Sequence, residues 1–162
     1  MKNGIRLRKI VPDDNPKVAR LIKYILEDMK VPKIGTAYAD AALDDMYANY
    51  NTPKAVYYVI EMEGHITACA GIAPLVGGSD TICELQKMYV AQGYRGRGLA
   101  SELIQACFQK AREFGFKQCY LETLPYMEAA QILYQKNGFE YIEWPLGHTG
   151  HDQCSIYMLK VL

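Results

Sequence analysis

The chain has 162 residues, of which 50% are hydrophobic and 22% are charged, and its 18 basic residues balance its 18 acidic ones. This length predicts one domain over residues 1–162, and the composition excludes disordered and low-complexity classes. A protein with a net charge of zero lacks the overall positive field that attracts nucleic acids and anionic membranes, so we expect neither as a partner.

The first half of the chain predicts one strand, two helices and then three strands. Residues 5–10 alternate apolar and basic side chains, as a half-buried strand does. Residues 13–16 (D-D-N-P) are typical of a helix start, and apolar residues follow at helical spacing as far as Met29. The remaining elements are a helix over 36–50, strands over 55–62, 66–75 and 81–90, and a glycine-rich loop at 77–80.

In the second half, strands and helices alternate. A helix over 99–114 carries apolar residues on one face and ends at Gly115, a natural C-terminal cap. This order predicts an α/β fold in which helices flank one mixed sheet. The elements after this helix are a strand over 118–124, a helix over 125–136 and strands over 139–142 and 154–161, with a loop at 144–152.

The N-terminal segment and the cysteines predict where the protein works. Residues 1–8 carry basic side chains and no apolar stretch of signal-peptide length. The longest apolar run, 55–60, is far shorter than the roughly 20 residues that cross a bilayer. Five cysteines form no C-x-x-C pair, and most lie within apolar runs, as core residues do in a reducing compartment. We therefore expect a soluble, cytoplasmic protein.

A segment rich in glycine and arginine, residues 95–98 (R-G-R-G), leads directly into the helix over 99–114. Glycines let the backbone approach a ligand closely, and the free N–H groups of a helix start, together with the helix dipole, attract anions. The two arginines supply charge that phosphate oxygens use. A plain glycine-rich loop with two solvated arginines has the same pattern, so the segment alone leaves both interpretations open.

Two known phosphate-binding loops do not fit this segment. Gly93 and Gly98 have the spacing of a Walker loop, but Leu99 and Ala100 stand where Lys and Ser/Thr are required. Residues 96–101 approximate the dinucleotide fingerprint, yet a five-residue segment separates them from the strand that the fingerprint normally follows directly. We therefore expect neither NTP hydrolysis nor dinucleotide binding.

Residues 95–100 (R-x-x-G-x-A) resemble the R/Q-x-x-G-x-G/A signature of the GNAT superfamily of acyl-CoA-dependent N-acetyltransferases. Residues 127–139 (M-x-x-A-x-x-L-Y-x-x-x-G-F) are similar to a second family block, A-x-x-L-Y-x-x-x-G-F. The resemblance is close over residues 84–141 and implies a mostly antiparallel mixed sheet flanked by about four helices. It also implies that the two central strands, which hold residues 88–90 and 121–123, splay apart.

The resemblance implies acetyl-CoA as cosubstrate. Backbone N–H groups of residues 95–100 would hold the pyrophosphate, and the pantetheine amides would pair with Met88 and Val90 as an added strand does. Two positions depart from the family pattern: Ala100 replaces the usual glycine, and Met127 replaces an asparagine that contacts the cofactor. The predicted cofactor-binding residues are Met88, Tyr89, Val90, Arg95, Gly96, Arg97, Gly98, Leu99, Ala100 and Met127.

Acetyl transfer needs a proton acceptor, because an alkylamine with a pKa near ~10.4 is almost entirely protonated at neutral pH. Glu84, six positions before Val90, matches the base of the histone-acetylating members of the family. The alternative for Glu84 is a strand glutamate that lies on the surface or pairs across a hairpin. Glu122, on the neighbouring predicted strand, is the second candidate for the base.

Acetyl transfer also needs stabilisation of the oxyanion and of the leaving thiolate. By family analogy, the amide of Met88 would donate to the oxyanion. Tyr134 matches the family's general-acid tyrosine, whose phenol donates to the sulfur of coenzyme A without being ionised at neutral pH. The alternative for Tyr134 is a core residue of an amphipathic helix. The predicted catalytic residues are thus Glu84 and Tyr134.

The loop before the last strand holds His148, His151 and Cys154 at intervals of three. They are candidate zinc ligands, but no second Cys/His pair completes a set of four, so we expect no metal. This loop borders the acceptor pocket in proteins of the family, so the histidines, with Trp144 and Tyr141, are a candidate wall for a small molecule. A polar surface loop is the alternative. A second candidate for an aromatic lining, unless it simply packs together, is the cluster of Tyr38, Tyr47, Tyr50, Tyr57 and Tyr58.

These features predict an N-acetyltransferase that moves the acetyl group from acetyl-CoA to a primary amine of a small molecule, by direct attack in a ternary complex. Two alternatives stay open: a protein lysine or N-terminal acetyltransferase, and a non-catalytic acyl-CoA-binding module. The presence of both Glu84 and Tyr134 favours an enzyme, and no acidic run suits the docking of a basic tail. The sequence does not identify the acceptor, and it is compatible with a homodimer.

Overall fold

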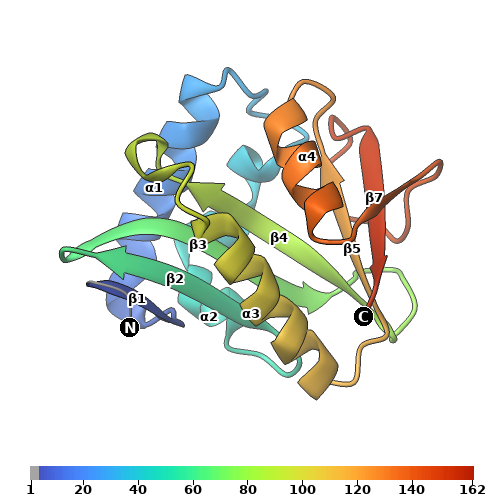
Figure 1. The fold of residues 1–162 in the computed structure, drawn as a ribbon. Coiled ribbons are helices and arrows are strands. Elements are labelled where there is room, and N and C mark those ends of the chain that lie inside the picture. The colour runs from blue at the N-terminus through green and yellow to red at the C-terminus, as the bar shows by residue number, and fades with distance from the viewer. Residues whose placement is uncertain (1–3) are drawn as a thin grey trace.

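The computed structural model describes residues 4–162, so Met1–Asn3 of the basic N-terminal segment lie outside it. Seven strands form one sheet in the order β1-β2-β3-β4-β5-β7-β6 (Figure 1). All neighbouring strands are antiparallel except β4 and β5, which are parallel, so the predicted mixed and mostly antiparallel sheet is confirmed. The strands are β1 (Ile5–Lys9), β2 (Val56–Met62), β3 (His65–Pro74), β4 (Ile82–Val90), β5 (Gln118–Thr123), β6 (Glu140–Ile142) and β7 (Ile156–Val161).

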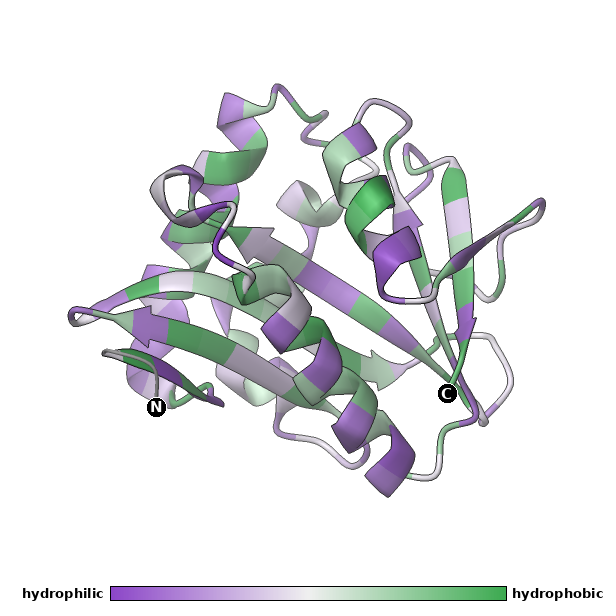
Figure 2. Cartoon of the chain, viewed as in Figure 1, coloured by the Kyte–Doolittle hydropathy of each residue, from purple (hydrophilic) through white to green (hydrophobic). Residues whose placement is uncertain are grey.

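Helices cover both faces of this sheet (Figure 1). On one face, Ile22 and Leu26 of α1 belong to a buried apolar cluster with residues of β2 and β3. On the other face, Leu103 and Phe108 of α3 belong to a second cluster, which α4 joins through Tyr134. Figure 2 shows hydrophilic residues along the outer side of α3 and hydrophobic strand residues beneath it. The helices are α1 (Asn15–Asp28), α2 (Met46–Tyr50), α3 (Leu99–Glu113) and α4 (Glu128–Lys136). No helix within residues 4–162 has the length and apolar character needed to cross a membrane.

The helix predicted over 36–50 is wrong in its first two thirds. The segment forms two short 3₁₀ turns, η2 (Ala37–Ala39) and η3 (Ala41–Asp44), before α2 begins. Aspartates explain the break, because their side chains compete with the helical backbone for hydrogen bonds. Asp45 accepts the N–H of Ala48 at 3.0 Å and caps α2, whereas Asp40 forms ion pairs with distant side chains.

The parallel pair of strands stays together for only a short distance. β4 and β5 pair at three positions, the last of which joins Glu84 to Tyr120, and then separate. On its other side, β4 holds an extra residue opposite β3, since Cys69 pairs with Tyr89 but Gly71 pairs with Gln86. This β-bulge bends β4 away from β5. The predicted splay of the two central strands is therefore present.

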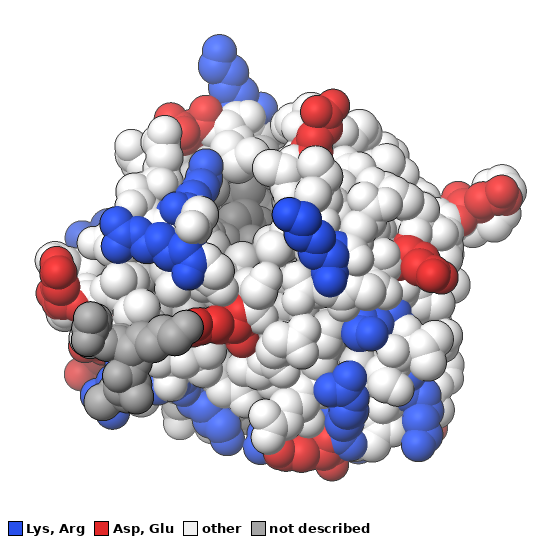
Figure 3. All heavy atoms as spheres, viewed as in Figure 1, with Lys and Arg blue, Asp and Glu red and all other residues white. Residues whose placement is uncertain are grey.

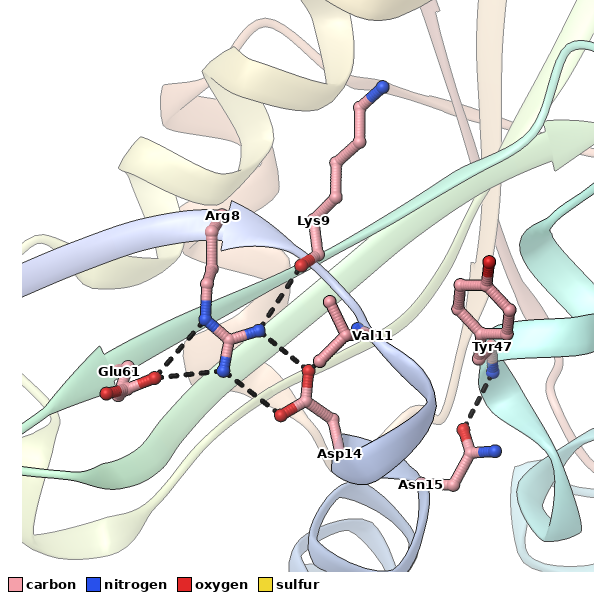
Figure 4. A network of polar contacts seen from close by, with 7 residues as sticks. All are labelled: Arg8, Lys9, Val11, Asp14, Asn15, Tyr47 and Glu61. Atoms are coloured by element: carbon pink, nitrogen blue, oxygen red, sulfur yellow. Dashed lines mark hydrogen bonds and ion pairs between the residues drawn. The ribbon is translucent and has the colours of Figure 1, made fainter.

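A buried ion pair fixes the start of the chain against the sheet (Figure 4). Arg8 on β1 contacts Asp14 with two N···O distances of 2.7 and 3.0 Å, and also Glu61 on β2 at 2.9 Å. Asp14 is 2% exposed, and its carboxylate also accepts the backbone N–H of Val11 at 2.8 Å. The network therefore holds the residues that precede α1 against β1 and β2.

We expect Asp14→Ala to lower the free energy of unfolding by about 3 kcal/mol, because it leaves a largely buried guanidinium without its main partner. Burial raises the pKa of Asp14, but the hydrogen bonds from Arg8 and Val11 outweigh it and lower the pKa overall. The carboxylate therefore stabilises the fold at neutral pH, and this contribution disappears as the pH falls through its lowered pKa. Urea unfolding at pH 7 measures the loss. The exposed neighbour Asp13→Ala is the control, and equal effects of both variants would contradict the role of the network.

Candidate active site

The separation of β4 from β5 opens a cavity of about 430 Å³. Its walls come from both strands, the start of α3, one side of α4 and the segment that follows α1. Figure 3 shows a hollow on this face, beside basic side chains that lie over the segment before α3. All predicted site residues except Arg97 line the cavity, namely Glu84, Met88, Tyr89, Val90, Arg95, Gly96, Gly98, Leu99, Ala100, Met127 and Tyr134.

The N-terminus of α3 forms one end of the cavity. Gly98 is the N-cap residue of this helix, with φ +79°, and Gly96 has φ +75°. A Cβ atom would meet nothing within 4 Å at either position, so it is the left-handed backbone rather than crowding that favours glycine here. The N–H groups of the first helical turn have no partner within the helix, and the helix dipole adds positive potential. This end of the cavity is therefore suited to an anion such as a pyrophosphate.

The two arginines beside this end have different surroundings. Arg95 lines the cavity, and its Nε donates to the carbonyl of Val90 at 3.0 Å. Arg97 lies over the ring of Tyr94, 5.1 Å from its centre, and donates to the carbonyl of Gly93 at 3.3 Å. Arg95 therefore adds charge at the cavity, whereas Arg97 packs along the 3₁₀ turn η4 (Gln92–Tyr94).

Glu84 lies at the point where β4 leaves β5 and is only 5% exposed. Its Oε1 accepts from Nε2 of Gln86 at 2.5 Å, and Oε1 of Gln86 in turn accepts from the hydroxyl of Tyr50 at 2.6 Å. The second oxygen of Glu84 has no hydrogen-bond partner within residues 4–162. Every buried side-chain polar atom of these residues has one, so this oxygen is not buried and opens to the cavity that Glu84 lines. Burial raises the pKa of Glu84 and outweighs the opposing hydrogen bond from Gln86. This carboxylate is therefore a stronger base than one on the surface.

Glu122 on β5 lines the same cavity but has both oxygens engaged. One accepts from the hydroxyl of Tyr120 at 2.6 Å, and the other accepts from the hydroxyl of Thr149. Each hydroxyl occupies one acceptor position of the carboxylate, whereas Glu84 keeps one oxygen that accepts from no side chain within residues 4–162. The geometry therefore favours Glu84 over Glu122 as a proton acceptor.

Tyr134 points from α4 toward the cavity. Its ring meets Phe139 edge-on at 5.9 Å between centres and is 9% exposed. The hydroxyl of Tyr134 makes no hydrogen bond with any residue from 4 to 162. Every buried side-chain polar atom of these residues has a partner, so this hydroxyl is not buried and opens to the cavity that Tyr134 lines. Burial raises the pKa of Tyr134 well above 10, so the phenol keeps its proton at neutral pH.

Lys87, which lines the cavity, and Asp40, which pairs with it, have no counterpart among the residues predicted from the sequence. Nζ of Lys87 lies 2.8 Å from Oδ2 of Asp40, and Nε2 of His151 lies 2.8 and 2.9 Å from the two oxygens of the same carboxylate. Lys87 and His151 line the cavity. A lysine in a strand gives no sequence signal of this kind, because only the bulge in β4 and a loop far along the chain bring these residues together.

Comparison with known proteins identifies the chain. Residues 20–139 match the acetyltransferase (GNAT) family. The chain is 43% identical over 157 residues to the Escherichia coli K12 protein described as uncharacterized N-acetyltransferase YjgM, covering 96% of this chain and 94% of that protein. The chain belongs to the GNAT family. The predicted family is thereby confirmed, and with it acyl-CoA-dependent N-acetyltransferase activity as the class of this GNAT protein.

Solved structures show that the GNAT fold extends over nearly the whole chain. A GNAT acetyltransferase of Staphylococcus aureus Mu50 superposes with a TM-score of 0.87 at 20% identity, over 98% of this chain and 99% of that one. PaiA N-acetyltransferase of Thermoplasma acidophilum, solved in complex with coenzyme A, superposes with a TM-score of 0.73 at 13% identity, over 98% and 99% of the two chains. At these identities the likeness concerns the fold alone.

The predicted walls of the acceptor pocket are wrong for this GNAT protein except at His151, which lines the cavity. Trp144 is 76% exposed and Tyr141 49% exposed, and neither lines the cavity, because the loop after β6 turns outward. His148 also lies outside the lining, since its N–H donates to Val76 and its ring packs beside Gly77. The tyrosine cluster does not line the cavity either: Tyr38, Tyr47, Tyr50, Tyr57 and Tyr58 lie outside it.

The loop before β7 holds the candidate zinc ligands His148, His151 and Cys154. Within residues 4–162 no group of three His, Cys, Asp or Glu side chains is arranged to hold a metal ion. Cys154 does line the cavity, but burial raises the pKa of its thiol to about 12. The thiol is therefore protonated at neutral pH and is a poor nucleophile or metal ligand.

Proposed function

We propose that this GNAT protein transfers the acetyl group of acetyl-CoA to a primary amine of a small molecule, by direct attack in a ternary complex. The observation that carries the proposal is that one cavity joins the anion-binding start of α3 to Glu84 and Tyr134. A pyrophosphate at Gly98 and a pantetheine arm along Met88 and Val90 would bring the thioester between these two side chains.

Each side chain has a distinct part in the proposed transfer. Glu84 accepts the proton of the amine as its nitrogen attacks the thioester, directly or through one water. The N–H of Met88 donates to the carbonyl oxygen on which negative charge develops. Tyr134 donates a proton, or a hydrogen bond, to the departing sulfur. The free phenol and the free carboxylate oxygen both open to the cavity, as this division of roles requires.

Contacts between two segments that line the cavity support a small acceptor. The segment after α1 and the loop before β7 meet where the N–H of Gln153 donates to the carbonyl of Gly35 at 3.1 Å and where Asp40 pairs with His151. Both segments contribute residues to the cavity wall. A small molecule fits a cavity of about 430 Å³, whereas a folded protein surface would need a wider opening.

A thiol-release screen tests the proposal. Acetyl-CoA is offered with amino acids, polyamines, aminoglycosides and peptides, and release of free coenzyme A is followed with a thiol reagent. We expect release with at least one small amine. Release with peptides only would assign the protein to protein acetylation. Calorimetric binding of acetyl-CoA without release for any acceptor would assign it to a non-catalytic binding module.

We expect Glu84→Gln to reduce the rate about 10²-fold at a pH between the raised pKa of Glu84 and the pKa of the amine, because the amine then arrives protonated and the wild-type carboxylate can accept its proton. At high pH the solution supplies free amine, so the loss should shrink. Glutamine keeps the size of the side chain and can still accept a hydrogen bond from Gln86. A folding defect therefore does not account for a loss of rate in this variant. A pH–rate profile with a proven acceptor measures the effect.

Glu122→Gln is the matched variant for this experiment, since Glu122 is the other carboxylate of the cavity. A pH-dependent loss in this variant, with none in Glu84→Gln, would reverse the two assignments. A loss in Glu84→Gln that is uniform across pH would make Glu84 a residue that positions the acceptor.

A further inference from the structure

Lys87 and His151 line a part of the cavity that we call the acceptor end, and acetyl transfer to a simple amine does not use these two side chains. Lys87 and His151 line the cavity, whereas Asp40, the carboxylate that joins them, is not among the lining residues. The side chain of Lys87 is 6% exposed and that of His151 is 18% exposed. Both side chains therefore border the cavity, and both contact Asp40, whose side chain is 24% exposed.

The backbone holds Lys87 in an unfavourable conformation to bring it there. Lys87 is the bulged residue of β4 and has φ +48°, a conformation that costs energy for a side chain of this type. The carbonyl of Lys87 accepts a hydrogen bond from the hydroxyl of Tyr57 at 2.6 Å. Tyr57 belongs to the apolar cluster that contains residues of α1, so this bond fixes the bulge from that side of the sheet. A bulge without this lysine would bend β4 equally well, so the bulge does not by itself require a buried ammonium.

Lys87 and His151 share one carboxylate, that of Asp40. Burial raises the pKa of Asp40, but His151 and Lys87 together outweigh it and lower the pKa, so Asp40 is charged. Burial lowers the pKa of His151, and the hydrogen bond to Asp40 outweighs it and raises the pKa. An ammonium has three N–H donors, and Asp40 is the only side chain within residues 4–162 that pairs with Lys87. Donors therefore remain for an anion in the cavity.

The same cavity also has acidic side chains, one on β5 and one at the point where β4 leaves β5. Glu84 and Glu122 line it together with Lys87 and His151. A ligand that fits this arrangement carries both a positive and a negative group. Its negative group can pair with the basic side chains and its positive group with the acidic ones when water leaves the cavity.

We infer that the acceptor is a free amino carboxylic acid, whose carboxylate binds Lys87 and His151 while its amine faces Glu84 and Glu122. This inference rests on the proposed acetyl transfer and specifies its substrate class. It disfavours a protein lysine or a protein N-terminus as acceptor, because neither brings a carboxylate with its amine. It also disfavours simple amines, which would leave Lys87 desolvated without an added partner.

Three compounds that share one side chain test the inference: leucine, leucinamide and 3-methylbutylamine. Release of coenzyme A is measured for each, and we expect kcat/KM for leucine to exceed that for the other two by about 10- to 100-fold, the range for a lost hydrogen bond to a charged group. The amine of leucinamide is the weaker base and is more fully deprotonated, which favours the amide and makes the comparison conservative. If leucine is not a substrate, the same comparison is made with the best amino acid of the screen.

We expect Lys87→Met to raise KM for the amino acid and to bring the preference over the amide to within about threefold, and His151→Gln to reduce it in the same direction. Calorimetry with coenzyme A shows that each variant keeps its fold and its cofactor site. Lys9→Met is the matched control, because Lys9 is exposed and lies on β1, at the edge of the sheet.

Several results would overturn the inference. Equal or better use of the amide or the simple amine would overturn it and leave the proposed acetyl transfer standing. So would an equal loss for all three compounds in Lys87→Met, which would make the lysine structural. Binding of coenzyme A without transfer to any compound, or no binding at all, would overturn the proposed function and the inference together.

Discussion

Gly98→Glu is expected to weaken acetyl-CoA binding more than about 100-fold, or roughly 2.8 kcal/mol, while the protein stays folded. Gly98 caps α3 at the anion-binding end of the cavity, where a carboxylate would oppose the phosphates and compete for the free N–H groups. The side chain has room, since nothing lies within 4 Å of the Cβ position. Isothermal titration calorimetry measures the affinity, and circular dichroism verifies the fold.

Gly115→Glu is the control for Gly98→Glu. Gly115 follows the other end of α3, has φ +89° and also has nothing within 4 Å of its Cβ position. The two variants therefore impose similar backbone strain and the same added charge, and they differ in their distance from the cavity. We expect normal affinity for Gly115→Glu. Equal weakening in both would attribute the effect to strain, and unchanged affinity in Gly98→Glu would place the pyrophosphate elsewhere.

The parts of the site that the sequence predicts are those encoded by local spacing. A glycine pair before an amphipathic helix predicts the anion-binding turn at Gly96 and Gly98, and both residues take the left-handed conformation there. The resemblance of residues 95–100 and 127–139 to the family signatures implies the splay of β4 and β5, which the structure contains. The glycine pair and the two signatures each consist of residues close together in the chain, so a short pattern is sufficient.

The remaining features depend on long-range contacts that no short pattern carries. Asp40 and His151 are 111 positions apart yet share a hydrogen bond, and Lys87 meets them only because of the bulge in β4. The 3₁₀ turns in place of the predicted helix have the same origin, since the carboxylate of Asp40 pairs with Lys87 and His151 instead of with the backbone of its own segment. Tertiary contacts thus override helix propensity where the acceptor end is built.

Tyr134→Phe is expected to lower kcat about 10²- to 10⁴-fold, the range for loss of a general acid, with little change in acetyl-CoA affinity. The substitution removes only the hydroxyl and keeps the ring that packs edge-on against Phe139. Because that hydroxyl bonds to no residue from 4 to 162, its loss leaves no buried protein group without a partner. Stability should therefore be nearly unchanged, so a fall in kcat would report on chemistry.

Tyr58→Phe is the control for this experiment, because Tyr58 packs against the same apolar cluster but does not line the cavity. We expect wild-type kcat for it. The buried phenol of Tyr134 has a raised pKa, so the wild-type rate should show no decline caused by its ionisation below about pH 10. If Tyr134→Phe retains nearly the wild-type kcat, the thiolate leaves without an acid from the protein, and Tyr134 serves only to pack α4 against the sheet.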